Sequence, residues 1–142
     1  MTPSDFNAFC RSLPHTTHVV QWGGADVWKV GGKMFATMWA GDDPYAGITF
    51  KASPMSYELL RTEPGLRPAP YLASRGLKWI QRVSDESMSD DDLRLYLKHS
   101  YDLVFAGLPR KTRIALGGAD AVVSRPSASR RGPASGRGTR RG

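Results

Sequence analysis

A stretch of alternating apolar and polar residues, divided by glycine pairs, constrains the fold of this chain more than any other feature. Between Thr17 and Phe50, aromatic and β-branched residues recur at about every second position, which is the period of a strand with one buried face. Gly23-Gly24 and Gly31-Gly32 supply the positive φ that tight hairpin turns require. The stretch therefore predicts four antiparallel strands, the last two joined by a longer loop, AGDDPYAG.

Helical patterns lie on both sides of these strands. Before them, start signals at residues 2–4 precede apolar residues at the i, i+3, i+4, i+7 spacing of a buried helix face, and Pro14 ends this helix. After them, Ser53-Pro54 is typical of an N-cap followed by proline at the first helical position. This second helix is expected to run to about Glu63, where Pro64-Gly65 stops it.

The remaining elements are two short strands, expected near residues 70–73 and 77–83, and the longest helix. In the second of these strands one side carries Leu77, Trp79 and Val83 and the other carries Lys78 and Arg82. We therefore expect Trp79 to be buried between the sheet and the helices and the basic side to be exposed to solvent. Ser89, three residues before Asp92, resembles a capping pair at the start of the last helix. The order of elements predicts an α+β fold, a two-layer α/β sandwich in which helices cover one face of an antiparallel sheet.

Charge is distributed unevenly along the sequence. Residues 1–107 hold eleven Lys and Arg against twelve acids, whereas the rest of the chain holds nine against one. From Ser124 onward the chain is almost exclusively Ser, Pro, Gly, Ala, Thr and Arg, which cannot bury enough apolar surface to fold. We therefore predict a folded domain over residues 1–113 and a disordered basic tail over residues 114–142, whose charge favours an anionic partner.

The sequence gives no sign of an oxidising compartment or of a membrane. Its one cysteine, Cys10, cannot form an intrachain disulfide. No segment approaches the roughly 18 apolar residues that a transmembrane helix needs, and the N-terminus lacks the regions of a signal peptide. We expect a cytoplasmic protein without membrane association.

Several short motifs along the predicted domain occur together in one known family. They are Gly32-Lys33-Met34-Phe35-Ala36, Lys51 before Ser53-Pro54, Pro64-Gly65, Ala69-Pro70-Tyr71, Arg75 before Trp79, and Ser100-Tyr101 followed by Val104 and Lys111. Each motif is weak alone, but in this order and spacing the chain resembles the MmcQ/YjbR family over about residues 4–113.

The resemblance implies a fold and a function. The family's fold is similar to that of the frataxin homologue CyaY, and its members are described as DNA-binding through a double-wing arrangement. Two positions depart from the family pattern, since Arg75 stands where Lys is frequent and Lys78 where His often precedes the tryptophan. Both keep a positive or ionisable side chain. The arginine-rich tail lies outside the resemblance.

Basic residues are the candidate nucleic-acid contacts, because Lys and Arg neutralise phosphates. Strand parity, the hairpin turn and the resemblance together select six in the domain: Lys29, Lys33, Lys51, Arg75, Lys78 and Arg82. The tail adds Arg130, Arg131, Arg137, Arg140 and Arg141, which we expect to dominate non-specific affinity. The alternative interpretation is that these are ordinary solvent-exposed charges, and RNA is the alternative partner to DNA.

Aromatic residues and the cysteine have a simpler structural interpretation. The four tryptophans could stack on unpaired bases, but a domain this small needs most of them in its core, and we expect at most one to be exposed. Cys10 could be a nucleophile with His15 or His18 as its base. It occupies the apolar stripe of the first helix, where free cysteine usually behaves as a small hydrophobe.

No metal or catalytic constellation is evident. The two histidines lack further ligands at metal-site spacing, and helix capping explains most of the acidic cluster, which comprises Asp85, Glu86, Asp90, Asp91 and Asp92. We therefore predict a non-enzymatic DNA-binding protein without cofactors. One rival is a frataxin-like domain for metal handling or protein interaction, because fold does not fix function. A second is an enzyme, which would need a pocket with strongly shifted titratable groups.

Overall fold

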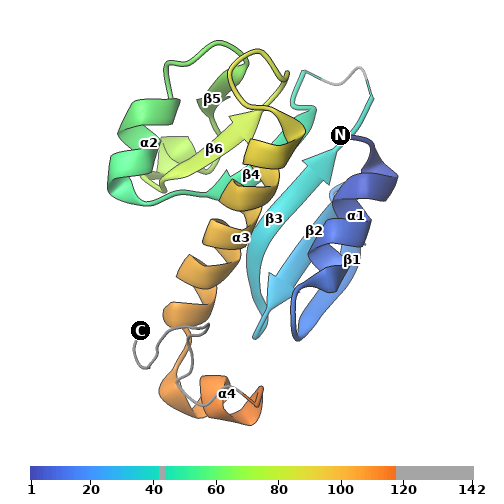
Figure 1. The fold of residues 1–142 in the computed structure, drawn as a ribbon, viewed down its shortest axis with the longest axis vertical. Helices are drawn as coiled ribbons and strands as arrows, with labels where there is room; N and C mark the ends of the chain where they lie inside the picture. The colour runs from blue at the N-terminus through green and yellow to red at the C-terminus, as the bar shows by residue number, and fades with distance from the viewer. Residues whose placement is uncertain (42–43, 118–142) are drawn as a thin grey trace. The chain divides into compact units, whose positions relative to one another are not determined.

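The computed structural model describes residues 1–41 and 44–117. Its helices are α1 (Pro3–Ser12), α2 (Pro54–Leu60), the 3₁₀ turn η1 (Ala73–Arg75), α3 (Asp90–Ala106) and α4 (Arg110–Ala115) (Figure 1). Its strands are β1 (Thr16–Gln21), β2 (Ala25–Val30), β3 (Lys33–Trp39), β4 (Gly47–Lys51), β5 (Leu66–Pro68) and β6 (Trp79–Arg82). These elements confirm the predicted order of helix, four strands, helix, two strands and long helix, although one of the two short strands lies at other residues than expected.

Residues 1–105 form one compact unit, and the chain from Ala106 onward belongs to a second. Within the second unit, α4 spans the predicted domain boundary at residue 113, and its Arg113 Nη1 donates a hydrogen bond to Leu108 O (2.5 Å). The predicted tail lies outside the described residues from position 118 onward.

The strands form one sheet in the order β1-β2-β3-β4-β6-β5, and every neighbouring pair is antiparallel. This confirms the predicted α+β fold with an antiparallel sheet. The strand expected at residues 70–73 is wrong, because β5 lies earlier, at Leu66–Pro68. Pro70 has no N–H for a ladder and Tyr71 has a φ of 66°, so the chain turns there and continues into η1.

The predicted helix starts are confirmed by their capping hydrogen bonds. The hydroxyls of Thr2, Ser53 and Ser89 accept from the backbone N–H three residues later, at 3.1, 3.2 and 3.1 Å. Each bond satisfies one of the N–H groups that a helix start leaves without an intrahelical partner. The second helix ends at Leu60, three residues before the expected Glu63.

One face of the sheet is covered by α1 and α3, and we call it the helix-covered face. The register places Trp28, Ala36, Phe50 and Ile80 in one row on this face. Trp28 Nε1 donates to the α1 residue Asn7 (2.8 Å). The Phe50 ring lies 5.7 Å from that of Tyr96 in α3.

A buried serine joins the sheet to α3 where β3 and β4 stop pairing. Their last described pair is Ala36 with Phe50. Beyond it, the Ser100 hydroxyl donates to Phe35 O (2.6 Å) and accepts from Lys51 N (2.9 Å). Because Ser100 satisfies both backbone groups in a fully buried position, its role in this motif is structural.

Candidate nucleic-acid interface

The face of the sheet opposite α1 and α3, which we call the open face, carries a continuous row of residues across all six strands. The register aligns them in the order Val19, Val27, Thr37, Thr49, Gln81 and Arg67. Successive side chains of a strand point to opposite faces, so this row alternates with the row that contains Trp28 and Phe50. The polar members of this row lie on four neighbouring strands, which are β3, β4, β6 and β5 in spatial order.

A pocket of about 430 Å³ lies over this row, and we call it the open-face pocket. Its polar floor is formed by Thr37, Thr49 and Gln81. Its lining also includes aromatic and basic side chains from four segments of the chain, namely Trp22, Trp39, Tyr45, Tyr71 and Arg75. The pocket therefore combines an apolar wall with a few polar groups, which is typical of ligand sites.

The pocket floor is held in place by the side chains of Arg67 and Gln81. Arg67 Nε donates to Gln81 Oε1 (2.7 Å), and Gln81 Nε2 donates to Tyr45 O (2.8 Å) and Thr49 Oγ1 (3.3 Å). Arg67 Nη2 donates to Pro44 O (2.8 Å). These bonds tie the β3–β4 connection to β5 and β6, so they fix Tyr45 beside the pocket.

Gly47, the first residue of β4, allows Gln81 to occupy the floor. A Cβ at Gly47 would lie 2.8 Å from Gln81 Cγ and 2.9 Å from Arg82 O. The φ of Gly47 is 151°, a value that side-chain-bearing residues rarely adopt. Glycine is therefore required here both by the backbone and by the close approach of Gln81.

Two of the aromatic residues at the pocket have an unusual backbone conformation. Trp22 and Tyr71 have φ values of 53° and 66°, in the left-handed region where bulky residues are outliers. Such conformations cost on the order of 1–3 kcal/mol each. Their side chains are 56% and 66% exposed, so burial does not offset this cost.

The two tyrosines of the pocket contact each other. The rings of Tyr45 and Tyr71 are 5.3 Å apart with an interplanar angle of 43°. Tyr45 is 40% exposed. Together with Trp22, the two rings form an exposed aromatic group on a sheet whose other large aromatic residues are mostly buried.

Among the predicted basic residues, Lys33, Lys51, Arg75 and Lys78 are exposed and Lys29 is half-buried. Within residues 1–41 and 44–117, none of the five forms an ion pair. Lys51 lies two residues after Thr49 on β4 and pairs with Trp79, so both Lys51 and Trp79 belong to the open face. Arg75 lines the open-face pocket, and Lys29 and Lys33 flank the β2–β3 turn.

The expected outward orientation of Arg82 is wrong. Arg82 pairs in register with Ile48 on the helix-covered face and is only 6% exposed. Its Nε donates to Met88 O (3.0 Å), and its Nη2 forms an ion pair with Asp90 Oδ1 (2.8 Å). Arg82 does alternate with Trp79, but this side of β6 faces the helices, where Asp90 pairs with the charge of Arg82.

Lys78 is exposed, but it does not share a face with Lys51 as expected. Its Nζ lies 5.0 Å from the ring centroid of Tyr57 in α2, an arrangement that favours a cation–π interaction. Lys51 instead pairs with the neighbouring Trp79. The exposed basic strand face predicted for β6 is therefore absent, because all four residues of β6 are buried.

Two tryptophan predictions are confirmed, namely the burial of Trp79 and the exposure of at most one tryptophan. Trp79 is 7% exposed and Trp28 is 2% exposed, whereas Trp22 is the one tryptophan in the exposed class. The expected position of Trp79 between the sheet and the helices is wrong, because Trp79 alternates with Ile80 and pairs with Lys51 on the open face. Leu77 and Val83, the residues expected to share its buried side, are themselves exposed.

Cys10 is fully buried in α1, as predicted. Burial raises the pKa of its thiol to about 12, because a thiolate is poorly solvated inside the protein. The reactive thiolate form is therefore scarce at neutral pH.

Several members of the acidic cluster and one histidine, His18, have partners within the protein. The hydrogen bond from the Met1 amino group, followed by that from Arg82, lowers the pKa of Asp90. Asp91 pairs with Arg94 (2.9 Å), and His18 Nε2 lies 2.8 Å from Asp26 Oδ1. In the part of the chain that the structure describes, no three His, Cys, Asp or Glu residues are grouped as a metal site. No described helix is long and apolar enough to cross a membrane.

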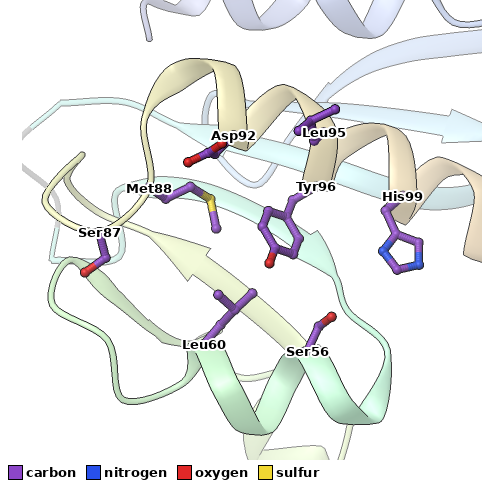
Figure 2. Close-up of a pocket in the computed structure, with 8 residues that line it drawn as sticks. All are labelled: Ser56, Leu60, Ser87, Met88, Asp92, Leu95, Tyr96 and His99. Atoms are coloured by element: carbon purple, nitrogen blue, oxygen red, sulfur yellow. The ribbon is translucent and has the colours of Figure 1, made fainter.

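A second cavity, of about 510 Å³, lies in a groove between α2 and α3 on the helix-covered side. Figure 2 shows Tyr96 and Met88 in the middle of this groove, with Asp92 and His99 toward opposite ends. Within the described residues, no hydrogen bond joins His99 to Ser56 or Ser87, which also line the groove. The groove therefore lacks the linked nucleophile and base of a hydrolase.

Five predicted contacts lie outside the described residues, namely Arg130, Arg131, Arg137, Arg140 and Arg141. Sequence reasoning missed the open-face pocket itself, including Tyr45, Tyr71 and Gln81. One signal was available, because Tyr45 and Tyr71 each follow a proline in a turn-like segment. An aromatic residue in such a segment is poorly placed to join a core.

The geometry can be compared with known proteins. No curated protein matches the sequence significantly. The structure is similar to the crystal structure of Deinococcus radiodurans protein DR2400, which carries the family-model domain DUF419. The two chains are 26% identical, the match covers 86% of this chain and 92% of DR2400, and the TM-score is 0.71. The YjbR family model matches residues 11–103, which include every residue that lines the open-face pocket. Since this range is well over half of the chain, the protein belongs to the YjbR family.

Proposed function

We propose that this protein is a non-enzymatic DNA-binding protein whose open face contacts the nucleic acid. The observation that carries the proposal is the combination, on and beside one sheet face, of exposed aromatic rings with cations that lack a carboxylate partner among the described residues. The DNA-binding description of the family that the chain resembles points the same way.

The charges support contact with phosphates. Lys51 and Arg75 lie on the open face or at its pocket, and Lys29 and Lys33 flank the adjacent β2–β3 turn. Such cations bind phosphates without reading sequence. Helix α3 offers a contrast, because its cations Arg94 and Lys98 each pair with an aspartate on the same helix. The tail arginines add sequence-independent attraction in this proposal.

Two features argue against an enzyme. The Cys10 thiol is buried with a pKa of about 12, and the groove between α2 and α3 has no hydrogen-bonded pair of nucleophile and base among its described lining residues. The open-face pocket is lined mainly by aromatic and neutral polar side chains, which suit binding better than proton transfer.

The test is a fluorescence anisotropy titration with labelled duplex and single-stranded DNA at several salt concentrations. We expect Lys51→Ala combined with Arg75→Ala to weaken binding and to lower the slope of log K against log salt by about one to two units, because each lost phosphate contact removes about 0.9. The matched control is Arg94→Ala combined with Lys98→Ala, which removes the same charge from α3 and should leave binding nearly unchanged.

The tail is tested by ending the chain after Gly117, so that α4 stays intact. This deletion removes Arg125, Arg130, Arg131, Arg137, Arg140 and Arg141. If about half of these six contact phosphate, the salt slope falls by roughly two to three units. An unchanged slope would exclude the tail as a contact, and equal losses in the open-face and α3 double variants would exclude the open face.

A further inference from the structure

We propose that the open-face pocket holds one unpaired base of single-stranded DNA, with Arg75 binding the adjoining phosphate. This inference rests on the proposed function and adds a specific ligand group to it. Cations along the face would bind either a duplex or a single strand. The pocket selects an unpaired base, because a base within a duplex stack cannot enter a cavity unless it leaves the stack.

The size and lining of the pocket suit a planar ring. Its volume of about 430 Å³ lies within the roughly 300–1,000 Å³ that ligand pockets occupy. The aromatic members Trp22, Trp39, Tyr45 and Tyr71 offer ring faces on which bases stack regardless of sequence. The other apolar lining residues are Ala25, Met34, Pro70 and Leu72.

Two exposed rings at the pocket stand on strained backbone. Trp22 and Tyr71 combine high exposure with left-handed backbone conformations, so backbone preference does not favour them there, and the contact of Tyr71 with Tyr45 leaves both rings largely exposed. Strain of this kind is concentrated at functional sites. A stacking role accounts for both features, because it requires a large ring on a turn that projects from the sheet.

The floor of the pocket offers hydrogen bonds to a base edge. Thr49 Oγ1 accepts from Gln81 and keeps its own O–H as a donor. The Thr37 hydroxyl is mostly buried, and within residues 1–41 and 44–117 it has no hydrogen-bond partner. A buried polar group in this state is explained by a ligand that completes its hydrogen bonding.

The charge of Arg75 determines which kind of ligand can bind to the aromatic lining of the pocket. Aromatic cages also bind cations such as guanidinium groups, which would make an arginine of the tail a competing occupant. Arg75 lines the pocket and has no ion-pair partner among the described residues, so it repels a cation and attracts an anion. A ring attached to a phosphate satisfies both the aromatic wall and Arg75.

The experiment compares Trp22→Asn combined with Tyr71→Asn against the full-length wild-type chain. Asparagine tolerates positive φ, so the double variant removes both rings without adding backbone strain. The probes are a labelled oligothymidylate and a labelled duplex of equal length, and the control variant is Leu95→Asn, an exposed apolar residue of α3. We expect the pocket variant to bind the single strand at least tenfold more weakly, to bind the duplex within twofold of wild type, and to keep its salt slope.

A second variant guards against misfolding of the first. Thr37→Val keeps the shape of the side chain and removes the floor hydroxyl, and we expect it to weaken single-strand binding severalfold. Thymidine monophosphate is added as a competitor, and we expect it to displace the strand only in large excess. Tighter binding of the free nucleotide than of the strand would overturn the assignment to a strand.

The outcomes separate this inference from the proposed function. If wild-type protein binds neither probe, nucleic-acid binding itself is refuted. If it binds both and the two pocket variants bind the single strand as wild type does, the base pocket is wrong while nucleic-acid binding stands. Equal weakening for single strand and duplex would also overturn the pocket, because it indicates a general contact surface.

Discussion

Aromatic and basic side chains have different environments on the two faces of the sheet. On the helix-covered face, the indole of Trp28 donates to Asn7 and the guanidinium of Arg82 pairs with Asp90. On the open face, the rings of Trp22 and Tyr71 are more than half exposed. Arg75, at the same pocket, pairs with no carboxylate among the described residues.

The difference separates residues that stabilise the fold from residues that are available to a ligand. Buried rings and paired charges on the helix-covered face are explained by folding alone. The exposed rings on the open face carry backbone strain and bury little of their surface. Features that folding does not explain are expected at functional sites.

The largest expected difference between the faces comes from matched tryptophan substitutions. Trp28→Ala, on the helix-covered face, should lower the free energy of unfolding by roughly 3–5 kcal/mol because the side chain is buried. Trp79→Ala should lower it by a similar amount, because Trp79 is also buried although its register places it on the open face. Trp22→Ala should change it by less than about 0.5 kcal/mol. Urea denaturation measures all three. A stable Trp79→Ala variant with weakened DNA binding would make Trp79 a stacking residue instead.

The arginines give the next largest contrast. Arg82→Ala should destabilise the protein by about 1.5–3 kcal/mol, because it removes a buried hydrogen bond to Met88 O and the ion pair with Asp90. Arg75→Ala should leave thermal stability unchanged and weaken DNA binding. Thermal denaturation and anisotropy on both variants test the pair. The comparison fails if Arg75→Ala destabilises as much as Arg82→Ala.

Substitutions at two glycines test whether single-strand binding depends on the position of Gln81 in the pocket floor. Gly47→Ala should destabilise by about 1 kcal/mol or more and should weaken single-strand binding, because the new Cβ displaces Gln81. Gly23→Ala is the control, since Gly23 also has a positive φ but its Cβ would meet no atom within 4 Å. It should destabilise through strain alone and keep its binding. Equal binding losses in both variants would contradict the proposed role of Gln81.

The smallest effect concerns alkaline pH and the helix-covered side. Burial raises the pKa of Cys10 to about 12, and burial followed by Asp102 raises that of Tyr101 to about 12. Both groups have lower pKa values when unfolded, so their stabilising contribution is complete below about pH 9 and declines as pH rises toward 12. We expect a loss of about 1 kcal/mol by pH 9.5 in urea denaturation. Cys10→Ala should show a shallower decline, and an equally steep decline would assign the effect to other groups.

Most of the fold was predictable because it depends on local patterns. The period-two alternation and the glycine pairs gave the first four strands, and capping residues such as Ser53 and Ser89 gave the helix starts. The misplaced strand at residues 70–73 had a local cause, since β-prone residues there are interrupted by Pro70 and by the turn at Tyr71.

The site was less predictable because it depends on register between distant strands. Alternation separates Trp79 from Lys78 and Arg82, but it does not say which of the two sets faces the helices. Only the pairing of β6 with β4 places Arg82 on the helix-covered face and Lys51 on the open face. The pocket likewise requires Trp22, Tyr45 and Tyr71 to meet across the sheet, which no sequence spacing encodes.

The four tryptophan indoles offer the most direct test of the claim that DNA binds the open face. Trp22 and Trp39 line the open-face pocket, whereas the indole of Trp28 is bonded to Asn7 on the helix-covered face. In a heteronuclear NMR titration of the full-length ¹⁵N-labelled protein with single-stranded DNA, we predict that the indole resonances of Trp22 and Trp39 shift while that of Trp28 does not. A shift of the Trp28 resonance with no change in those of Trp22 and Trp39 would contradict the account.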